Sequence, residues 1–268
     1  MKRRRAFALP TIVIVALIFA VMLTVMIERN TAQVLLTQRQ YESYTFSHAT
    51  RGVGEAVDAW IRSNQSRPIA DALGDEGWAF DLEADGGTTV RVYLHDGQGL
   101  ALADLAGLRA DALDSGVEIL RALRDLHPDR AARLVRREGP LAVSVNAAPP
   151  EVLEAVVDSV MAGSGTRDIV AELTAGRAGR AMDDEGLTRI IDASHADGDA
   201  KPRLKALLTA SPILWRVEAQ ARSRATGVLG DRFAAWAVIS RGSRAGGDRA
   251  AAVQRTVSVF GWEKTEDR

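Results

Sequence analysis

The residues that could support catalysis or metal binding are few in this 268-residue chain. The four histidines are far apart along the sequence, and no two of them are spaced as a pair of metal ligands: His48, His95, His127 and His195. The chain has no cysteine, which excludes disulfides and thiolate metal sites. It also lacks the G-x-S-x-G and H-E-x-x-H motifs of common hydrolases. We therefore expect a protein that is not an enzyme and needs no cofactor.

Acidic side chains gather at two places in the second half of the chain. Asp183 and the two acids after it precede a helical pattern, where carboxylates cap the helix and favour its dipole. Asp192, Asp197 and Asp199 could hold a hard cation such as calcium through oxygen ligands. A solvated loop rich in Asp and Gly is the simpler interpretation, so we predict no metal site.

The N-terminus combines a basic leader with a long apolar run. Lys2 and three arginines come before an apolar stretch from Phe7 to Ile27. At a rise of roughly 1.5 Å per residue, about 21 residues can cross a hydrocarbon core roughly 30 Å thick. Basic residues before the span predict a cytoplasmic N-terminus. We therefore expect a single-pass anchor with the main domain on the outer side of the membrane.

The rest of the sequence predicts an α+β fold. Val53, Val57 and Ile61 lie on one helical face, so the anchor should continue as a helix of about 55 residues that packs on the soluble domain. A block of short helices is flanked by segments with strand alternation, which indicates an all-α subdomain inserted into one antiparallel sheet. The predicted helices are 116–126, 149–161, 166–175, 184–193 and 202–209, and the predicted strands are 78–82, 90–94, 213–221, 233–239 and 253–260.

These patterns predict seven parts of the chain. They are a leader (1–6), a membrane span (7–27), a helical continuation and linker (28–65), the first part of the α/β domain (66–113), the helical insertion (114–210), the C-terminal strands (211–262) and a tail (263–268). The formal net charge of −1 argues against a general nucleic-acid binder.

The junction between leader and span resembles a type IV prepilin signal. Arg4 and Arg5 are followed by Ala6 and then by Phe7 at the head of the apolar run. The resemblance implies that a prepilin peptidase cuts between Ala6 and Phe7 and that the new N-terminus is methylated. Gly is the usual residue before the cut, so Ala6 departs from the pattern. Thr11 would be the fifth mature residue, where most pilins and pseudopilins carry Glu.

A second motif, LAVSVNAAPPEVL, spans residues 141–153. Its residues predict a well-started helix: Asn146 can turn the chain through an Asx turn, and Pro149 and Pro150 set φ in the first helical turn. Glu151 then lies where a carboxylate favours the helix dipole. The segment resembles the V-N-x-A-P-x-E-V-L motif of the K-type minor pseudopilins of the type II secretion system. Members of that family also lack the Glu at the fifth mature position, which is Thr11 here. The residues that carry this likeness are Asn146, Ala148, Pro149, Pro150, Glu151 and Leu153.

The order of the surrounding parts extends this resemblance to the general secretion pathway protein K family from Arg4 to about Arg241. Residues 93–105 are similar to the family's strand and acidic-Gly turn, and residues 207–219 to the entry into its last sheet. The family's calcium-linked aspartates before the second motif have no counterpart here, so calcium is not carried over.

The resemblance implies a non-catalytic minor pseudopilin at the tip of the pseudopilus, which supports export of folded proteins across the outer membrane. Its implied partners are other minor pseudopilins, the inner-membrane secretion platform and the prepilin peptidase. Its implied place is the inner membrane, with the main domain in the periplasm.

Two alternatives stay open. The segment 145–173 also resembles a helix-hairpin-helix unit, in which Gly163, Ser164 and Gly165 with Arg167 would grip a DNA phosphate. Nearby acids oppose that binding, so we do not expect a nucleic-acid partner. A minor type IV pilin is the other alternative.

Overall fold

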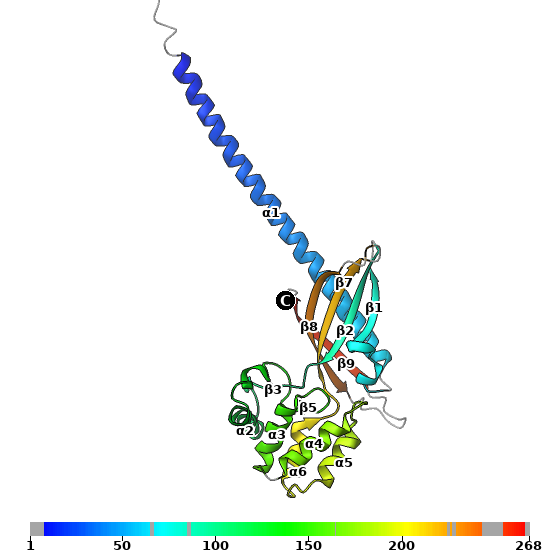
Figure 1. Ribbon diagram of the computed structural model, residues 1–268. Helices are drawn as coiled ribbons and strands as arrows, with labels where there is room; N and C mark the ends of the chain where they lie inside the picture. The colour runs from blue at the N-terminus through cyan, green and yellow to red at the C-terminus, as the bar shows by residue number, and fades with distance from the viewer. Residues whose placement is uncertain are drawn as a thin grey trace, which may run out of the picture. The chain divides into compact units, whose positions relative to one another are not determined.

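The computed structural model describes residues 8–64, 67–84, 87–163, 165–223, 226, 229–242 and 254–265. The chain separates into two compact units, Met1–Val53 and Gly54–Arg268. The first unit consists of most of one long helix, and the second contains the end of that helix, a sheet and a group of short helices (Figure 1).

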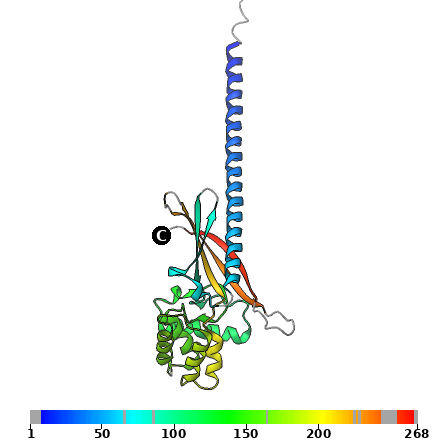
Figure 2. The same ribbon diagram turned by 90° about the vertical axis from the view of Figure 1, so that its right-hand side faces the viewer.

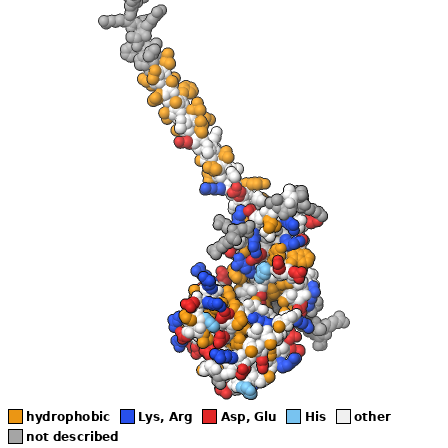
Figure 3. Space-filling model, in the orientation of Figure 1, with side chains coloured by type: hydrophobic (Ala, Val, Ile, Leu, Met, Phe, Trp, Pro, Cys, Tyr) orange, Lys and Arg blue, Asp and Glu red, His pale blue; other side chains and the backbone are white. Residues whose placement is uncertain are grey.

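Helix α1 runs from Ala8 to Ser63, which confirms the predicted length of about 55 residues with an observed 56. Its described side chains between Ile12 and Ile27 are exposed, and hydrophobic side chains cover this segment in Figure 3. The helix is long and apolar enough to cross a membrane, with a mean hydropathy of 2.4 in its most apolar part. Thr24 donates its hydroxyl hydrogen to the carbonyl of Ala20 at 2.9 Å, which satisfies a polar group on the apolar surface.

The last turns of α1 belong to the second unit and pack on the sheet (Figure 2). Val57 and Ile61 are completely buried. The rings of Trp60 and Phe80 lie 6.1 Å apart, and a side chain at Gly54 would touch Val259. The apolar stripe predicted for this segment is therefore confirmed as the face that covers the sheet.

The sheet has five antiparallel strands in the order β1-β2-β7-β8-β9. Asp96 at the end of β2 pairs with Trp215 near the start of β7. The chain therefore leaves the sheet at the end of β2 and returns to it in the neighbouring strand, β7. The strands are β1 (Trp78–Ala84), β2 (Thr88–Asp96), β7 (Leu214–Ser223), β8 (Leu229–Gly242) and β9 (Gln254–Thr265).

The helical segment between β2 and β7 has its own apolar core. Its helices are α2 (Ala110–Leu126), α3 (Pro150–Met161), α4 (Thr166–Gly176), α5 (Asp184–Ala193) and α6 (Ala200–Leu207). Two short parallel pairs join them: β3 (Ala101–Leu102) with β4 (Val135–Arg136), and β5 (Val143–Ser144) with β6 (Leu208–Thr209). The largest buried core side chains are Ile119, Leu123, Leu153, Leu173, Ile191 and Leu204.

Several element limits differ from the sequence predictions. Helix α2 begins at Ala110 rather than 116, and the last strand continues to Thr265. The last short helix ends at Leu207 rather than 209, because Leu208 and Thr209 pair with Val143 and Ser144. Strand pairing shows that residues 97–213 connect β2 to β7 outside the five-stranded sheet. The predicted domain limits at 114 and 210 stay predictions.

Candidate functional site

The first unit presents an apolar stripe that continues past the predicted membrane span. Ile27, Val34 and Tyr41 recur at intervals of seven residues, and Tyr44 lies three residues beyond Tyr41. Their exposed fractions are 58%, 65%, 71% and 64%. Because seven residues make nearly two helical turns, the four side chains form one narrow seam of the kind used between paired helices. We call these four residues the stem seam.

The predicted leader cleavage site falls outside the part of the chain that the structure describes. Ala6 and Phe7 lie outside the described residues, and Thr11 lies in α1 with its side chain outside them. Cleavage, methylation and the meaning of the missing Glu therefore stay predictions.

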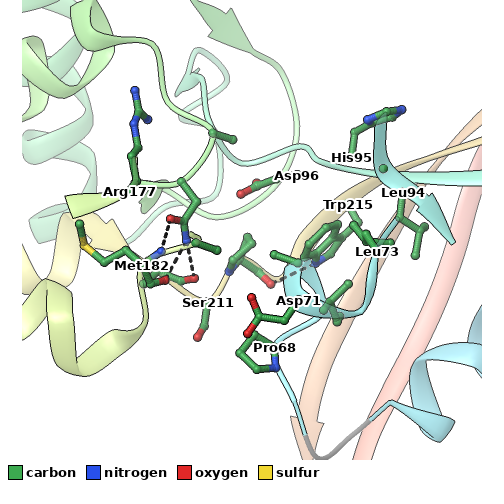
Figure 4. A pocket seen from close by; sticks show the side chains of 18 of the residues that line it. Pro68, Asp71, Leu73, Leu94, His95, Asp96, Arg177, Met182, Ser211 and Trp215 are labelled. Atoms are coloured by element: carbon green, nitrogen blue, oxygen red, sulfur yellow. Dashed lines mark hydrogen bonds between the residues drawn. The ribbon is translucent and has the colours of Figure 1, made fainter. Parts of the chain in front are cut away.

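Asn146 has a role that the sequence did not predict. Its side chain does not make a local Asx turn within the described chain. It donates hydrogen bonds to the carbonyls of Met182 at 3.0 Å and Ala210 at 3.2 Å, and it accepts one from the Met182 amide at 2.8 Å (Figure 4). Asn146 thus ties together the entry to α3, the loop before α5 and the segment before β7.

The remaining motif residues start α3 as their types predict. Pro149 is the N-cap and Pro150 the first helical residue. Glu151 lies 2.7 Å from Arg130, and a backbone hydrogen bond from its own amide, aided by Arg130, lowers its carboxyl pKa. Two further motif residues are buried, Ala148 at 1% exposure and Leu153 at 0%. The motif as a whole anchors α3 in the helical core.

A buried polar junction lies where the chain leaves and re-enters the sheet. Gln98, only 2% exposed, donates to the carbonyl of Ala142 at 2.8 Å and accepts from the amide of Ile213 at 2.9 Å. Asp96 accepts from the amide of Gln98 at 2.9 Å and from the hydroxyl of Ser144 at 2.5 Å. These bonds join both ends of the insertion to each other.

Arg136 completes this junction. Its guanidinium donates to the carbonyls of Leu100 at 2.9 Å and Ala142 at 3.2 Å, and also to those of Glu138 and Pro140. Burial lowers its pKa to about 10, although the charge of Asp96 acts the other way. Burial likewise raises the pKa of Asp96 against the opposing effects of its hydrogen bonds and of Arg136. Arg136 belongs to no recognisable motif, and the acidic-Gly turn that contains Asp96 does not reveal that its carboxyl is buried.

The acids considered for a cation have structural partners. Asp183 accepts a hydrogen bond from the amide of Gly186 at 2.7 Å, which confirms it as the cap of α5. Asp192 forms an ion pair with Lys205 at 2.7 Å. Within the residues that the structure describes, no group of three or more His, Asp or Glu side chains is placed to hold a metal ion.

The segment compared with a helix-hairpin-helix unit does form two consecutive helices. Gly163 and Gly165 both have positive φ, 86° and 75°, between α3 and α4. Ser164 lies outside the described residues. Arg167 and Asp168, both exposed, are neighbours at the start of α4, so a cation there is accompanied by an acid.

A cleft of about 830 Å³ is lined in part by Asn146 and by its hydrogen-bond partner Met182 (Figure 4). Its walls come from residues 68–77 after α1, from the adjoining ends of β2 and β7, and from the loop 177–183 between α4 and α5. The lining includes apolar side chains, such as Ile69 and Trp215, and charged ones, such as Arg180, so the cleft can bind a ligand. The junction residues beside it hold its walls in place.

Comparison with known proteins gives a likeness in structure alone. No family model matches the chain, and no curated protein matches it in sequence. The chain is similar to a chain in the crystal structure of the GspK-GspI-GspJ complex from the type 2 secretion system of enterotoxigenic Escherichia coli. The identity is 14%, the match covers 84% of this chain and 100% of that one, and the TM-score is 0.44.

Proposed function

We propose that the protein is a minor pseudopilin of a type II secretion system, of the K type. The observation that carries the proposal is the stem seam on a helix whose leader junction resembles a prepilin signal. The ordered motifs of the second unit support the same family. In this role the protein is not an enzyme, and it acts by assembling with other minor pseudopilins at the tip of the pseudopilus.

The physical basis of assembly is the burial of α1. In the bilayer, lipid covers its apolar side chains, and helix association there depends on close packing. Once the helix leaves the bilayer, the same side chains must be covered by partner helices to stay out of water. Complete burial of one large apolar side chain contributes about 1.5–3 kcal/mol, so a few seam residues can hold a complex together.

The role also assigns an orientation and a set of partners. The basic leader stays in the cytoplasm, where the prepilin peptidase cuts it, and the second unit lies in the periplasm. The inner-membrane platform then moves the assembled helices. These assignments come from the family resemblance and from the distribution of basic residues at the N-terminus.

Co-purification tests the proposal. The full-length chain is co-expressed with the candidate minor pseudopilins of its own genome, extracted in mild detergent and isolated through a tag on one partner. We expect a stable complex of defined stoichiometry. Consistent recovery of the chain as a monomer would count against the role, and a complex with type IV pilins instead would favour a minor pilin.

The DNA-binding alternative has one observation in its favour, the glycine turn between α3 and α4. Backbone amides in such a turn can hold a phosphate. A titration of the full-length chain in nanodiscs with a fluorescent duplex tests it. Submicromolar binding that weakens with salt would support the alternative, whereas the acids near Arg167 lead us to expect none.

A further inference from the structure

The stem seam on α1 is bordered by side chains that carry no charge. The first seam position of its seven-residue repeat begins at Ile27, and the second lies three residues later, at Asn30, Thr37 and Tyr44. The positions on either side of these two border any helix that packs along the seam. Within residues 27–47 they hold only uncharged polar side chains, all of them exposed: Thr31, Gln33, Gln38, Gln40, Thr45 and Ser47. We call these six residues the seam flanks.

The charged side chains of the same segment lie at the three remaining positions of the repeat, which face away from the seam. They are Glu28, Arg29, Arg39 and Glu42. Glu42 is tied to one flank, because its carboxylate accepts a hydrogen bond from the side-chain amide of Gln38 at 3.0 Å. Paired helices that choose their partners by charge carry ions at the flanks. A helix packed on this seam would meet uncharged groups there instead.

The hydroxyl groups of three threonines on and beside the seam are already bonded within the helix. Thr31, Thr37 and Thr45 each donate to the backbone carbonyl four residues earlier, at 2.9, 2.9 and 2.8 Å. A neighbouring helix can therefore cover these side chains without leaving a hydroxyl donor unpaired. Asn30 is the other polar residue at a seam position, and its amide requires a hydrogen-bonding group from a helix that covers it.

We propose that the stem seam accepts a partner helix whose own contact face, flanks included, is uncharged. A charged flank on the partner would lose water against the Gln and Thr side chains of the seam flanks and gain no ion pair, which is unfavourable. The seam therefore selects partners by excluding charge, and the pairing is insensitive to salt. In the proposed function, on which this inference rests for the identity of the partner, that helix belongs to another minor pseudopilin.

Synthetic helical peptides test the proposal on the full-length protein in nanodiscs, with binding measured by fluorescence anisotropy. The probe is a fluorescein-labelled peptide of three seven-residue repeats. It has Ile and Leu at the seam positions with one Asn among them, Gln at every flank, and both Glu and Lys on its outer face. Two matched peptides carry Glu or Lys at every flank. We expect the Gln peptide to bind at least about tenfold more tightly than either, and equally well at low and at high salt.

Variants locate the binding on the seam. Gln33→Glu with Gln40→Glu should reverse the preference, so that the Lys peptide binds most tightly and its binding weakens with salt. Ala32→Glu with Ser43→Glu is the matched control, since both residues are exposed on the outer face, and the wild-type preference should remain.

Four results would overturn the proposal: equal binding of the three peptides, tighter binding of a charged peptide to the wild type, no saturable binding, or the same change in preference from both double variants. Circular dichroism checks that each variant keeps its helix content. If the peptides bind as expected but co-purification yields no complex with minor pseudopilins, the proposed function fails and the selectivity of the seam stands.

Discussion

The side chain of Asn146 and the backbone of Met182 exchange two hydrogen bonds, at 2.8 and 3.0 Å, although 36 residues separate them in sequence. A third bond, to the carbonyl of Ala210, brings a segment 64 residues away to the same amide. One asparagine therefore positions the loop that forms a wall of the cleft.

Asn146→Ala should lower the stability of the second unit and loosen that loop. The variant leaves the amide and carbonyl of Met182 without partners, at a cost of about 1–3 kcal/mol for each group that stays buried. Asn146→Asp keeps the acceptor but sets a carboxylate oxygen against the carbonyls of Met182 and Ala210, so its loss should be at least as large. Urea unfolding of the full-length protein in detergent measures both. Equal stability of the wild type and Asn146→Ala would contradict the assigned role.

The buried carboxyl of Asp96 should give a measurable pH dependence. Its pKa is raised above 3.8, so the folded state binds its proton more tightly than the unfolded chain does. Its contribution to the free energy of unfolding therefore falls as pH rises from 3.8 through the raised pKa, and is constant above it. Urea unfolding of wild type and Asp96→Asn, from about pH 4 to about pH 7, measures this contribution as their difference.

That difference between wild type and Asp96→Asn should decrease with rising pH. A matched change at the exposed carboxylate of Asp125, Asp125→Asn, should leave the pH profile of stability as in the wild type. A difference for Asp96→Asn that grows with pH would mean that the carboxylate, rather than the acid, is the form favoured by folding.

The stem seam predicts which face of α1 a partner helix contacts. Val34→Asp and Tyr41→Asp together should reduce recovery of the co-purified complex by about tenfold or more, since they place charges where apolar burial is needed. Leu36→Asp is the control, because Leu36 is similarly exposed, at 58%, but about 200° around the helix from Val34. An equal loss of complex from the seam variant and from Leu36→Asp would show that the stem seam is not the face that contacts a partner helix.

Replacing each of two glycines by alanine should change the stability of the protein in opposite directions. A Cβ on Gly99 would lie 2.7 Å from backbone atoms of Ala147, so Gly99→Ala should destabilise the protein by about 1–3 kcal/mol. Gly52 lies in helix α1 with nothing within 4 Å of its Cβ position, and Gly52→Ala should stabilise the helix by up to about 1 kcal/mol. Thermal unfolding in one detergent compares them. Equal unfolding temperatures would contradict the close approach at Gly99.

Local patterns in the sequence were enough to predict much of the fold. The stripe of Val53, Val57 and Ile61 predicted the face of α1 that covers the sheet, and alternation around Val217 predicted β7. These patterns repeat over several turns or residues, so they stand out from their surroundings. The acids before α5 were also predicted correctly as a cap, because the capping position is local.

The candidate sites depend instead on contacts between distant segments. Gln98, Arg136 and Asn146 each bond to backbone groups many residues away, and no spacing in the sequence reveals such partners. A buried Gln or Arg is also uncommon, so side-chain type alone predicts exposure. The cleft could not be predicted for the same reason, since several separate segments form it.

The proposed processing of the chain as a pseudopilin is tested most directly at its N-terminus. Mass spectrometry of the protein isolated from its native membrane determines the first residue and its modification. We predict a chain that begins at Phe7 with a methylated amine. An intact leader beginning at Met1 would contradict the claim and leave a membrane-anchored domain without a role in a filament.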